Sequence, residues 1–264
     1  TSCEMQGIKH YLIDELEPTC EFNVYTFKTL ADKYIKEIYE KGHLPIITGG
    51  TGFYIQSVVY DVDFKDNDDD KSIRKNLENL AKEKGNSYVY EILKQIDPIY
   101  AQSLHENNIK RVIRAIEFNK QTGLKMSEHN EEEMKKVPVF NLKYFVLNDD
   151  RQVLYDRINK RVDIMVKKGL IEEVERLKKA GIKRNMTSMQ GIGYKEIYSY
   201  LEGELSKEEA VYLIKKNTRH FAKRQLTWFK REKNVIMINK PDFNNDDNLI
   251  KEFMMEEINK LNWR

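Results

Sequence analysis

A short glycine-rich segment, Gly49-Gly50-Thr51-Gly52, is the first feature whose residue types could carry chemistry. Glycines between a strand and a helix let the backbone approach a ligand, and the N-terminus of a helix offers free N–H groups that suit phosphate. Thr51 adds a hydroxyl donor at the same place. The alternative is a tight turn in which Thr51 only caps the helix. The segment is not a Walker A loop, because the chain has no lysine in a GxxxxGK[ST] pattern.

Three further groups of donor side chains lie on expected helices or at the start of one. In the first two groups the arginines are spaced i, i+3 or i, i+4, so they share one helix face, and arginine can contact phosphate through two N–H groups at once. The third group is expected to be a flexible loop that opens a helix. For each group the alternative is an ordinary solvated surface. The groups are Arg157 with Arg161, then Lys110 with Arg111 and Arg114, and finally the run Gln190, Gly191, Ile192, Gly193, Tyr194 and Lys195, in which two glycines stand beside donors.

A basic segment between residues 215 and 231 contains no acidic residue, although the chain as a whole has a net charge of only +2. Aromatic residues, among them Phe221 and Trp228, are interleaved with its cations. Phosphate backbones are the natural partner of such a segment, and the alternative is a solubilising helix face with aromatic anchors. The cations are Lys215, Lys216, Arg219, Lys223, Arg224, Lys230 and Arg231.

Several classes of protein are excluded by composition. No apolar run approaches the ~18 residues of a membrane span, and the first residues resemble neither a signal peptide nor a transit peptide. The two cysteines, Cys3 and Cys20, form no CxxC pattern, and the five histidines have no metal-ligand spacing. No GxSxG motif or Cys–His pairing indicates a hydrolase. We therefore expect a soluble cytoplasmic protein.

The elements that must position these residues alternate near the start of the chain. Helix–strand–turn–helix order is typical of a parallel α/β sheet. We expect a strand at Tyr11–Ile13, a helix capped by Asn23 and ending near Lys41, a buried strand at Leu44–Thr48, and a helix at Phe53–Val59.

The pattern changes after an acidic linker at residues 61–70. The next segments are helical without a convincing strand, so residues 65–140 are expected to form a helical insertion. Its helices are Ser72–Lys84, Tyr88–Ile96 and Ile109–Gln121, with a turn starting at Asp97-Pro98. The chain then returns to the sheet with a strand at Tyr144–Leu147. A long helix follows, capped by Asp149 or Asp150 and broken at Gly169, and the next helix ends at Gly181. The last elements are a helix with a Ser206–Glu209 capping box, a strand at Val235–Ile238 and a terminal helix.

Taken in order, these motifs resemble the tRNA dimethylallyltransferase (tRNA isopentenylpyrophosphate transferase) family, bacterial type. Each motif alone is weak, but the ordered set is specific and covers nearly the whole chain from Gly7 to Lys230. The matching stretches are HYLID, LPIITGGTGFYI, DPIYAQSLHENNIKRVIRAIE, LYDRINKRVDIMVKKGL, SMQGIGYKE and TRHFAKRQLTWFK.

The resemblance implies a fold and a reaction. The fold would be a P-loop-kinase-like α/β core with a parallel sheet, formed by residues 1–64 and 141–264, and a helical insertion at 65–140 that binds the anticodon arm of tRNA. The reaction would move a dimethylallyl group from dimethylallyl diphosphate to N6 of adenosine 37, with Mg²⁺ assisting the diphosphate. The adenine must leave the stack to reach the site. A cytoplasmic monomer is expected.

The resemblance also assigns residues to these roles. Thr51 would hydrogen-bond the oxygen that links the dimethylallyl group to the diphosphate. Gly49, Gly50, Gly52 and Arg161 would bind the diphosphate, with Arg157 as the second choice of arginine. The residues implied to contact tRNA are Arg74, Lys110, Arg111, Arg114, Gln190, Gly191, Gly193, Tyr194, Lys195, Arg219, Lys223, Arg224, Gln225, Trp228, Lys230 and Arg231.

The sequence departs from the family pattern at its start. Members of the family begin with a strand and a P-loop, GPTxSGK[ST], followed by a segment with an aspartate that acts as the general base. Neither is present, so we expect that the chain lacks its N-terminal segment, that no metal-binding residue lies in it, and that it catalyses poorly as written. No zinc finger follows the basic segment, which favours the bacterial form.

Two other functions remain open from the sequence. A non-catalytic RNA-binding module would also carry the basic segment 215–231, and it would bind RNA without prenyl transfer. A small-molecule kinase of related fold would also use the strand–GGTG–helix turn, and it would need ATP and no tRNA. The ordered set of motifs argues against both.

Overall fold

The structure, a computed structural model, describes residues 5–64 and 72–261. It divides into two compact units: unit 1 comprises residues 1–58 and 140–264, and unit 2 comprises residues 59–139. The acidic linker expected at 61–70 reaches into residues 65–71, which lie outside the described part. The domain limits expected from the sequence, at 64/65 and 140/141, remain a prediction. In the described part, no helix is both long and apolar enough to cross a membrane.

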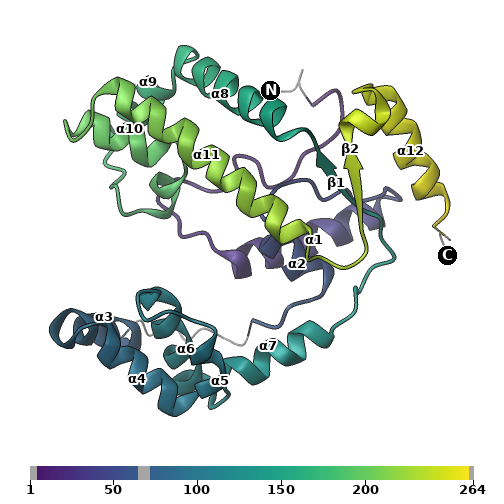
Figure 1. Ribbon diagram of the computed structural model, residues 1–264. Helices are drawn as coiled ribbons and strands as arrows, with labels where there is room; N and C mark the ends of the chain where they lie inside the picture. Colours follow the sequence, from purple (N-terminus) through teal and green to yellow (C-terminus); the bar gives the residue numbers. More distant parts are fainter. Residues whose placement is uncertain (1–4, 65–71, 262–264) are drawn as a thin grey trace. The chain divides into compact units, whose positions relative to one another are not determined.

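Unit 1 is mostly helical and holds a parallel pair of strands, β1 (Tyr144–Asn148) and β2 (Val235–Asn239). Tyr144 lies opposite Val235 and Asn148 opposite Asn239, and the two arrows run side by side in Figure 1. The helices of unit 1 are α1 (Val24–Glu40), α2 (Gly52–Val59), α8 (Arg151–Lys167), α9 (Leu170–Lys179), α10 (Tyr194–Leu201), α11 (Lys207–Phe229) and α12 (Asp247–Asn259), with the short 3-10 helices η1 (Thr187–Gln190) and η2 (Lys240–Phe243).

Local hydrogen bonds explain where several helices begin. The Asn23 side chain accepts the N–H of Thr26 at 2.9 Å, so α1 starts at the predicted cap. Ser206 and Glu209 exchange hydrogen bonds between side chain and backbone, which confirms the predicted capping box of α11. Gly169 adopts a left-handed conformation between α8 and α9, which an L side chain adopts only with strain. The two strands that pair, β1 and β2, were also predicted to within one residue.

Two predicted strands are wrong. Tyr11–Ile13 and Leu44–Thr48 form no strand, and the structure gives neither segment a neighbouring strand among the described residues. The apolar run at 44–48 suggested burial, yet Ile46 is 80% exposed. A strand is defined by hydrogen bonds to a partner, and an apolar run cannot supply that partner. The predicted parallel sheet is therefore limited to β1 and β2 in the described part.

The main core of unit 1 lies between α8, α9, α10 and α11. Fully buried side chains from all four helices and from η1 meet there, and each such side chain contributes ~1.5–3 kcal/mol through burial. This packing fixes the start of α11 along α8 and α10, and the basic segment continues the same helix. Its members include Val162, Val174, Met189, Ile197 and Ile214.

Unit 2 is a group of helices with its own core: α3 (Ser72–Lys84), α4 (Asn86–Ile96), α5 (Pro98–Gln102), α6 (Ile109–Thr122) and α7 (Met126–Lys135). Leu93, Val112 and Ile116 are buried at its centre. Asp97 caps α5 and also accepts two hydrogen bonds from Ser127, one of them from its backbone N–H at 2.8 Å. The sequence predicted α3, α4 and α6 but neither α5 nor α7.

Candidate functional site

The glycine turn Gly49–Gly52 leads directly into α2. The carbonyl oxygen of Thr51 accepts the N–H groups of Tyr54 at 2.9 Å and Ile55 at 3.2 Å, so Thr51 caps the helix through its backbone. Its side chain is exposed, and its hydroxyl makes no hydrogen bond within the described part of the chain. The hydroxyl can therefore donate to a ligand without disturbing the cap.

The same turn packs against the second half of α11. The Gln225 side chain donates to the carbonyl oxygen of Gly50 at 2.8 Å. A Cβ atom placed on Gly50 would lie 2.0 Å from Gln225 Nε2, and one on Gly52 would lie 2.2 Å from Trp228 Cδ1. Phe53 meets Trp228 edge to face, with 6.3 Å between the ring centroids. Gly52 is thus required by the close approach of the Trp228 ring, and Gly50 leaves room for the end of the Gln225 side chain. The sequence did not predict either contact with α11.

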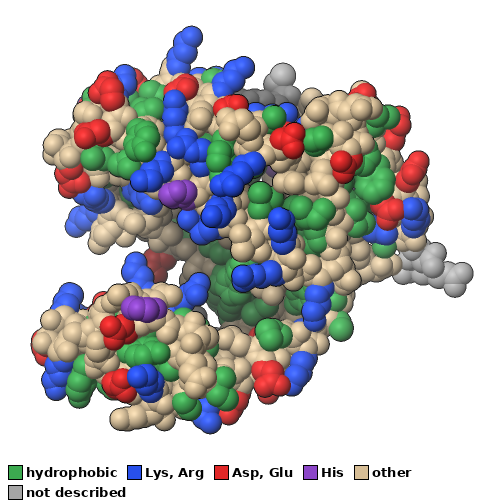
Figure 2. Space-filling model, in the orientation of Figure 1, with side chains coloured by type: hydrophobic (Ala, Val, Ile, Leu, Met, Phe, Trp, Pro, Cys, Tyr) green, Lys and Arg blue, Asp and Glu red, His purple; other side chains and the backbone are tan. Residues whose placement is uncertain are grey.

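The face of α11 beyond this contact is cationic. An open hollow of about 440 Å³ is lined by His220, Lys223, Arg224, Thr227, Trp228 and Arg231, and Figure 2 shows Lys and Arg side chains gathered over this helix. Glu232 is the first acidic residue beyond it, and burial raises the pKa of its carboxyl, although a hydrogen bond with Trp228 opposes the shift. The hollow therefore suits an anion that can also contact an aromatic ring.

The two arginines on α8 differ in their surroundings. Arg157 forms an ion pair with the nearly buried Asp149 at 2.7 Å. It also lies near Asp247, whose pKa is lowered mainly by Lys240 and in part by Arg157. Arg161 is exposed and has no ion pair with any residue in 5–64 or 72–261. Arg161 is thus the one of the pair that is available to an added anion.

Helix α8 runs antiparallel along α11. The Arg219 guanidinium donates to Asn159 Oδ1 at 2.6 Å, and Lys215 Nζ lies 2.6 Å from the Asp163 carboxylate. Later residues of α8 therefore face earlier residues of α11. Arg219 is half-buried and holds the two helices together, whereas the cations nearer the glycine turn remain exposed.

The run from Gln190 to Lys195 is tied down by its own donors. Gly193 has a φ of +105° and donates its N–H to Glu196 Oε2 at 2.8 Å. The Tyr194 hydroxyl donates to Glu173 at 2.6 Å, and burial together with this carboxylate raises the pKa of Tyr194 to about 12. Lys195 lies 3.7 Å from Glu196 and is half-buried, with 42% of its side chain exposed. Only part of the predicted donor set thus faces solvent.

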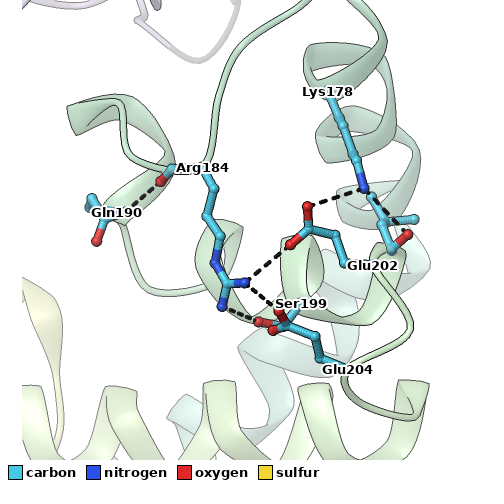
Figure 3. Close-up of polar contacts among 7 residues, drawn as sticks. Lys178, Arg184, Gln190, Ser199, Glu202 and Glu204 are labelled. Carbon is cyan, nitrogen blue, oxygen red and sulfur yellow. Dashed lines mark hydrogen bonds and ion pairs between the residues drawn. The ribbon is translucent and has the colours of Figure 1, made fainter.

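Arg184 anchors the segment that precedes this run. Its guanidinium binds Glu202 at 3.1 Å, Glu204 at 2.7 Å and Ser199 at 2.7 Å, and Figure 3 shows all three partners gathered around it. Its carbonyl oxygen accepts the Gln190 side-chain N–H at 2.5 Å. The hydrogen-bonding capacity of Gln190 is therefore used in part to hold η1.

Unit 2 carries the remaining predicted cations. Arg74 on α3 and Arg114 on α6 both bind Glu117 Oε2, at 2.6 Å and 3.1 Å. Lys110 and Arg111 are exposed at the start of α6. These four residues form one cationic group within unit 2.

The structure brings the glycine turn together with Gln225 and Trp228, and it keeps the exposed Lys230 and Arg231 at the end of α11. Gly191 follows η1 directly, next to Gln190. No cluster of three or more His, Cys, Asp or Glu suited to a metal occurs among the described residues. The sequence missed the buried Glu117, because a glutamate three residues after an arginine on a helix reads as a surface pair.

A turn that presents a free hydroxyl at a helix N-terminus, packed on a cationic helix, is typical of a protein that binds anionic substrates. The family model described as IPP transferase matches residues 1–232. The chain belongs to this family.

Named relatives agree with this membership. A tRNA dimethylallyltransferase of Lachnoclostridium phytofermentans is 56% identical over 251 residues, which is 95% of this chain and 80% of that protein. One of Acetivibrio thermocellus is 53% identical over 248 residues, covering 94% of this chain and 79% of that protein.

Solved structures agree as well. The crystal structure of the tRNA delta(2)-isopentenylpyrophosphate transferase of Staphylococcus epidermidis is 40% identical with a TM-score of 0.68, covering 98% of this chain and 84% of that one. A eukaryotic dimethylallyltransferase acting on tRNA is 26% identical with a TM-score of 0.80, covering 96% of this chain and 65% of that one. The fold of this chain is thus that of these transferases.

Proposed function

We propose that this chain transfers a dimethylallyl group from dimethylallyl diphosphate to N6 of adenosine 37 in tRNA. The observation that carries the proposal is the contact of the glycine turn with α11, through Gln225 on Gly50 and Trp228 on Gly52. A turn suited to diphosphate is thereby held against a helix face suited to RNA. The relatives, which are named for this reaction, support the same conclusion.

In this proposal Thr51 acts at the bond that breaks. The adenine N6 forms a bond to the dimethylallyl carbon while the bond from that carbon to the diphosphate oxygen breaks, and the proton that N6 loses passes to water or to the released diphosphate. Negative charge grows on the leaving oxygen, so a hydroxyl placed there stabilises the transition state more than the bound substrate. The exposed Thr51 hydroxyl, with no hydrogen bond inside the described chain, is suited to this role.

Arg161 is the arginine that we assign to the diphosphate, with Arg157 as the second choice. Arg157 is already neutralised by Asp149, so its recruitment would leave a nearly buried carboxylate without its partner, which is unfavourable. Recruitment of Arg161 breaks no ion pair described here.

The proposed tRNA surface has two parts. One is the cationic face of α11 with the run 190–195, and the other is the cation group of unit 2, the helical insertion that we assign to the anticodon arm. Adenosine 37 would lie in a single-stranded loop, where a base is most easily unstacked. The remaining core is proposed to be a P-loop-kinase-like sheet, of which β1 and β2 are the described strands.

Other expectations stay proposals. The residues around the glycine turn offer a hydroxyl and carbonyl groups but no carboxylate cluster, so they do not form a magnesium site by themselves, and Mg²⁺ is assigned no step here. The monomeric state and the cytoplasmic location are likewise proposed.

The test is transfer of labelled dimethylallyl from its diphosphate to an anticodon arm with adenosines at 36 and 37. Three proteins are compared: this chain, the Lachnoclostridium relative, and a hybrid that adds to this chain the part of the relative outside the aligned span. Transfer by this chain or by the hybrid supports the proposal. RNA binding without transfer by either, while the relative transfers, would favour the binding module instead.

A further inference from the structure

Trp228 is an aromatic side chain that the packing of α11 leaves partly open. The end of this helix has a buried aromatic anchor in Phe229, which is 7% exposed and meets Tyr144 of β1 edge to face, with 6.2 Å between the ring centroids. Trp228, by contrast, is 37% exposed, and it lines the cationic hollow of α11. A large aromatic surface that is open among cations suits a ligand that has both a flat ring and negative charge.

The indole of Trp228 is held in one orientation by its neighbours. It lies against the glycine turn, where a Cβ atom on Gly52 would come within 2.2 Å of its Cδ1 atom, and Phe53 meets it edge to face. The indole also forms a hydrogen bond with the carboxylate of Glu232, four residues further along the chain. A ring that is fixed before binding loses little conformational entropy when a ligand contacts it. Trp228 therefore presents a preorganised surface to the hollow.

Two arginines lie on either side of this ring along the chain. Arg224 comes four residues before Trp228 and Arg231 three residues after it, a spacing that places all three on one face. Arg231 follows the end of α11, but its backbone N–H donates to the Trp228 carbonyl at 2.9 Å and so keeps it in the same turn. Both arginines are exposed, and neither forms an ion pair with a residue that the structure describes. Proteins bind single-stranded nucleic acid with this combination of an aromatic ring and flanking cations.

We propose that Trp228 is a stacking platform for one unpaired base of the anticodon loop, whose flanking phosphates contact Arg224 and Arg231. Stacking depends little on salt, whereas the phosphate contacts weaken as salt is added. Because the same indole lies against Gly52, the stacked base is held beside the turn that we assign to the diphosphate. This inference rests on the proposed function, since it takes the anticodon arm of tRNA as the ligand.

The substitution W228L is tested against two forms of the anticodon arm. One form carries every base of its loop, and the other carries abasic sites in the loop, so that the phosphates remain while the bases are absent. Binding of the labelled arms to the full chain is followed by fluorescence anisotropy. Loss of stacking should raise the dissociation constant of the complete arm about tenfold and should leave that of the abasic arm unchanged.

Three other variants serve as controls. Y212L is the matched one, because Tyr212 is an exposed aromatic residue of α11 outside the hollow, and it should bind both arms as the unsubstituted chain does. W228F keeps an aromatic ring and should bind the complete arm more tightly than W228L. R231Q should weaken the binding of both arms and reduce the salt slope by about 0.7, whereas W228L should leave that slope unchanged.

Equal weakening of both arms by W228L would overturn the stacking role, because damage to the turn or the hollow acts without any base. Binding of the complete arm by W228L as tight as by Y212L would overturn it as well. Failure of the proposed function is a different result, in which the unsubstituted chain itself would not bind the complete arm.

A second measurement applies if W228L does not fold by circular dichroism. In a W263F background Trp228 is the remaining tryptophan of the chain. The complete arm should then quench the fluorescence of Trp228 through stacking, and the abasic arm should not. Equal quenching by the two arms, or none by either when both bind, would overturn the proposal.

Discussion

Replacement of Gly52 with alanine tests the packing of the glycine turn on α11. The added Cβ would lie 2.2 Å from Trp228 Cδ1, 2.3 Å from Nε1 and 2.8 Å from Cγ. Ordinary contact needs ~3.5 Å, so the indole ring or the turn must move by more than about 1 Å. Overpacking of this kind costs ~1–3 kcal/mol, and we expect about 2 kcal/mol because a rigid ring absorbs less displacement than a flexible chain.

Gly49 and Gly50 supply the graded controls. A Cβ on Gly49 would meet nothing within 4 Å, so G49A should leave the free energy of unfolding unchanged. In G50A the conflicting group is the end of the flexible Gln225 side chain, which can swing away at the loss of one hydrogen bond, about 1 kcal/mol. The expected order of destabilisation is G52A, then G50A, then G49A.

The assay is urea unfolding followed by tryptophan fluorescence in a W263F background, where Trp228 is the remaining tryptophan of the two in the chain. A loss of about 2 kcal/mol lowers the urea midpoint by about 1 M when m is ~2 kcal/mol/M. Because the effect depends on Trp228, a circular dichroism melt in a W228A background should show no cost of G52A. Equal midpoints for G52A and G49A would refute the packing argument.

Three further predictions follow from the proposed site. The rates and the KM values are measured with a form of the protein that transfers the dimethylallyl group. T51A should lower kcat about 100-fold. Its tRNA affinity and folding should change little, because the helix cap uses the Thr51 carbonyl, and T51S should retain the rate. An unchanged rate in T51A would remove the assigned role of the hydroxyl. R161Q should raise KM for dimethylallyl diphosphate about tenfold or more, and more than R157Q does; the reverse order would transfer the assignment to Arg157. Burial and Glu173 raise the pKa of Tyr194 from 10.0 to about 12. The protonated hydroxyl therefore stabilises the folded state below pH 10, and this stabilisation is lost as the pH rises from 10 to 12. Over that range the urea midpoint of Y194F should fall less than that of the unsubstituted protein, and identical pH profiles would contradict the role of the hydroxyl.

Local signals in the sequence predicted the helices well. Asn23, Ser206 with Glu209, and Gly169 act within a few residues of themselves, so their effect on helix ends needs no tertiary partner. The helix α7 was missed because none of its residues is buried and it therefore has no apolar stripe.

Features that depend on distant partners could not be derived in the same way. The run Leu44–Thr48 has the composition of a strand, but its state depends on a neighbour that the run itself does not specify. The glycines at 50 and 52 read as turn residues, whereas their close contacts come from Gln225 and Trp228. The burial of Glu117 depends on Arg74 from another helix. For the site residues, the family resemblance supplied roles that pattern alone left open.

The hydrogen bond from Gln225 to Gly50 joins residues that are 175 positions apart. In folding terms, the turn is complete only when a very long loop has closed, and the entropy of that closure opposes the contact. Unit 2 lies inside this loop and has its own core, so it can form before the loop closes. A small anion bound at the turn would therefore also stabilise the docking of α11. By reciprocity, RNA bound on α11 would strengthen the binding of the anion, so the two ligands are expected to bind cooperatively.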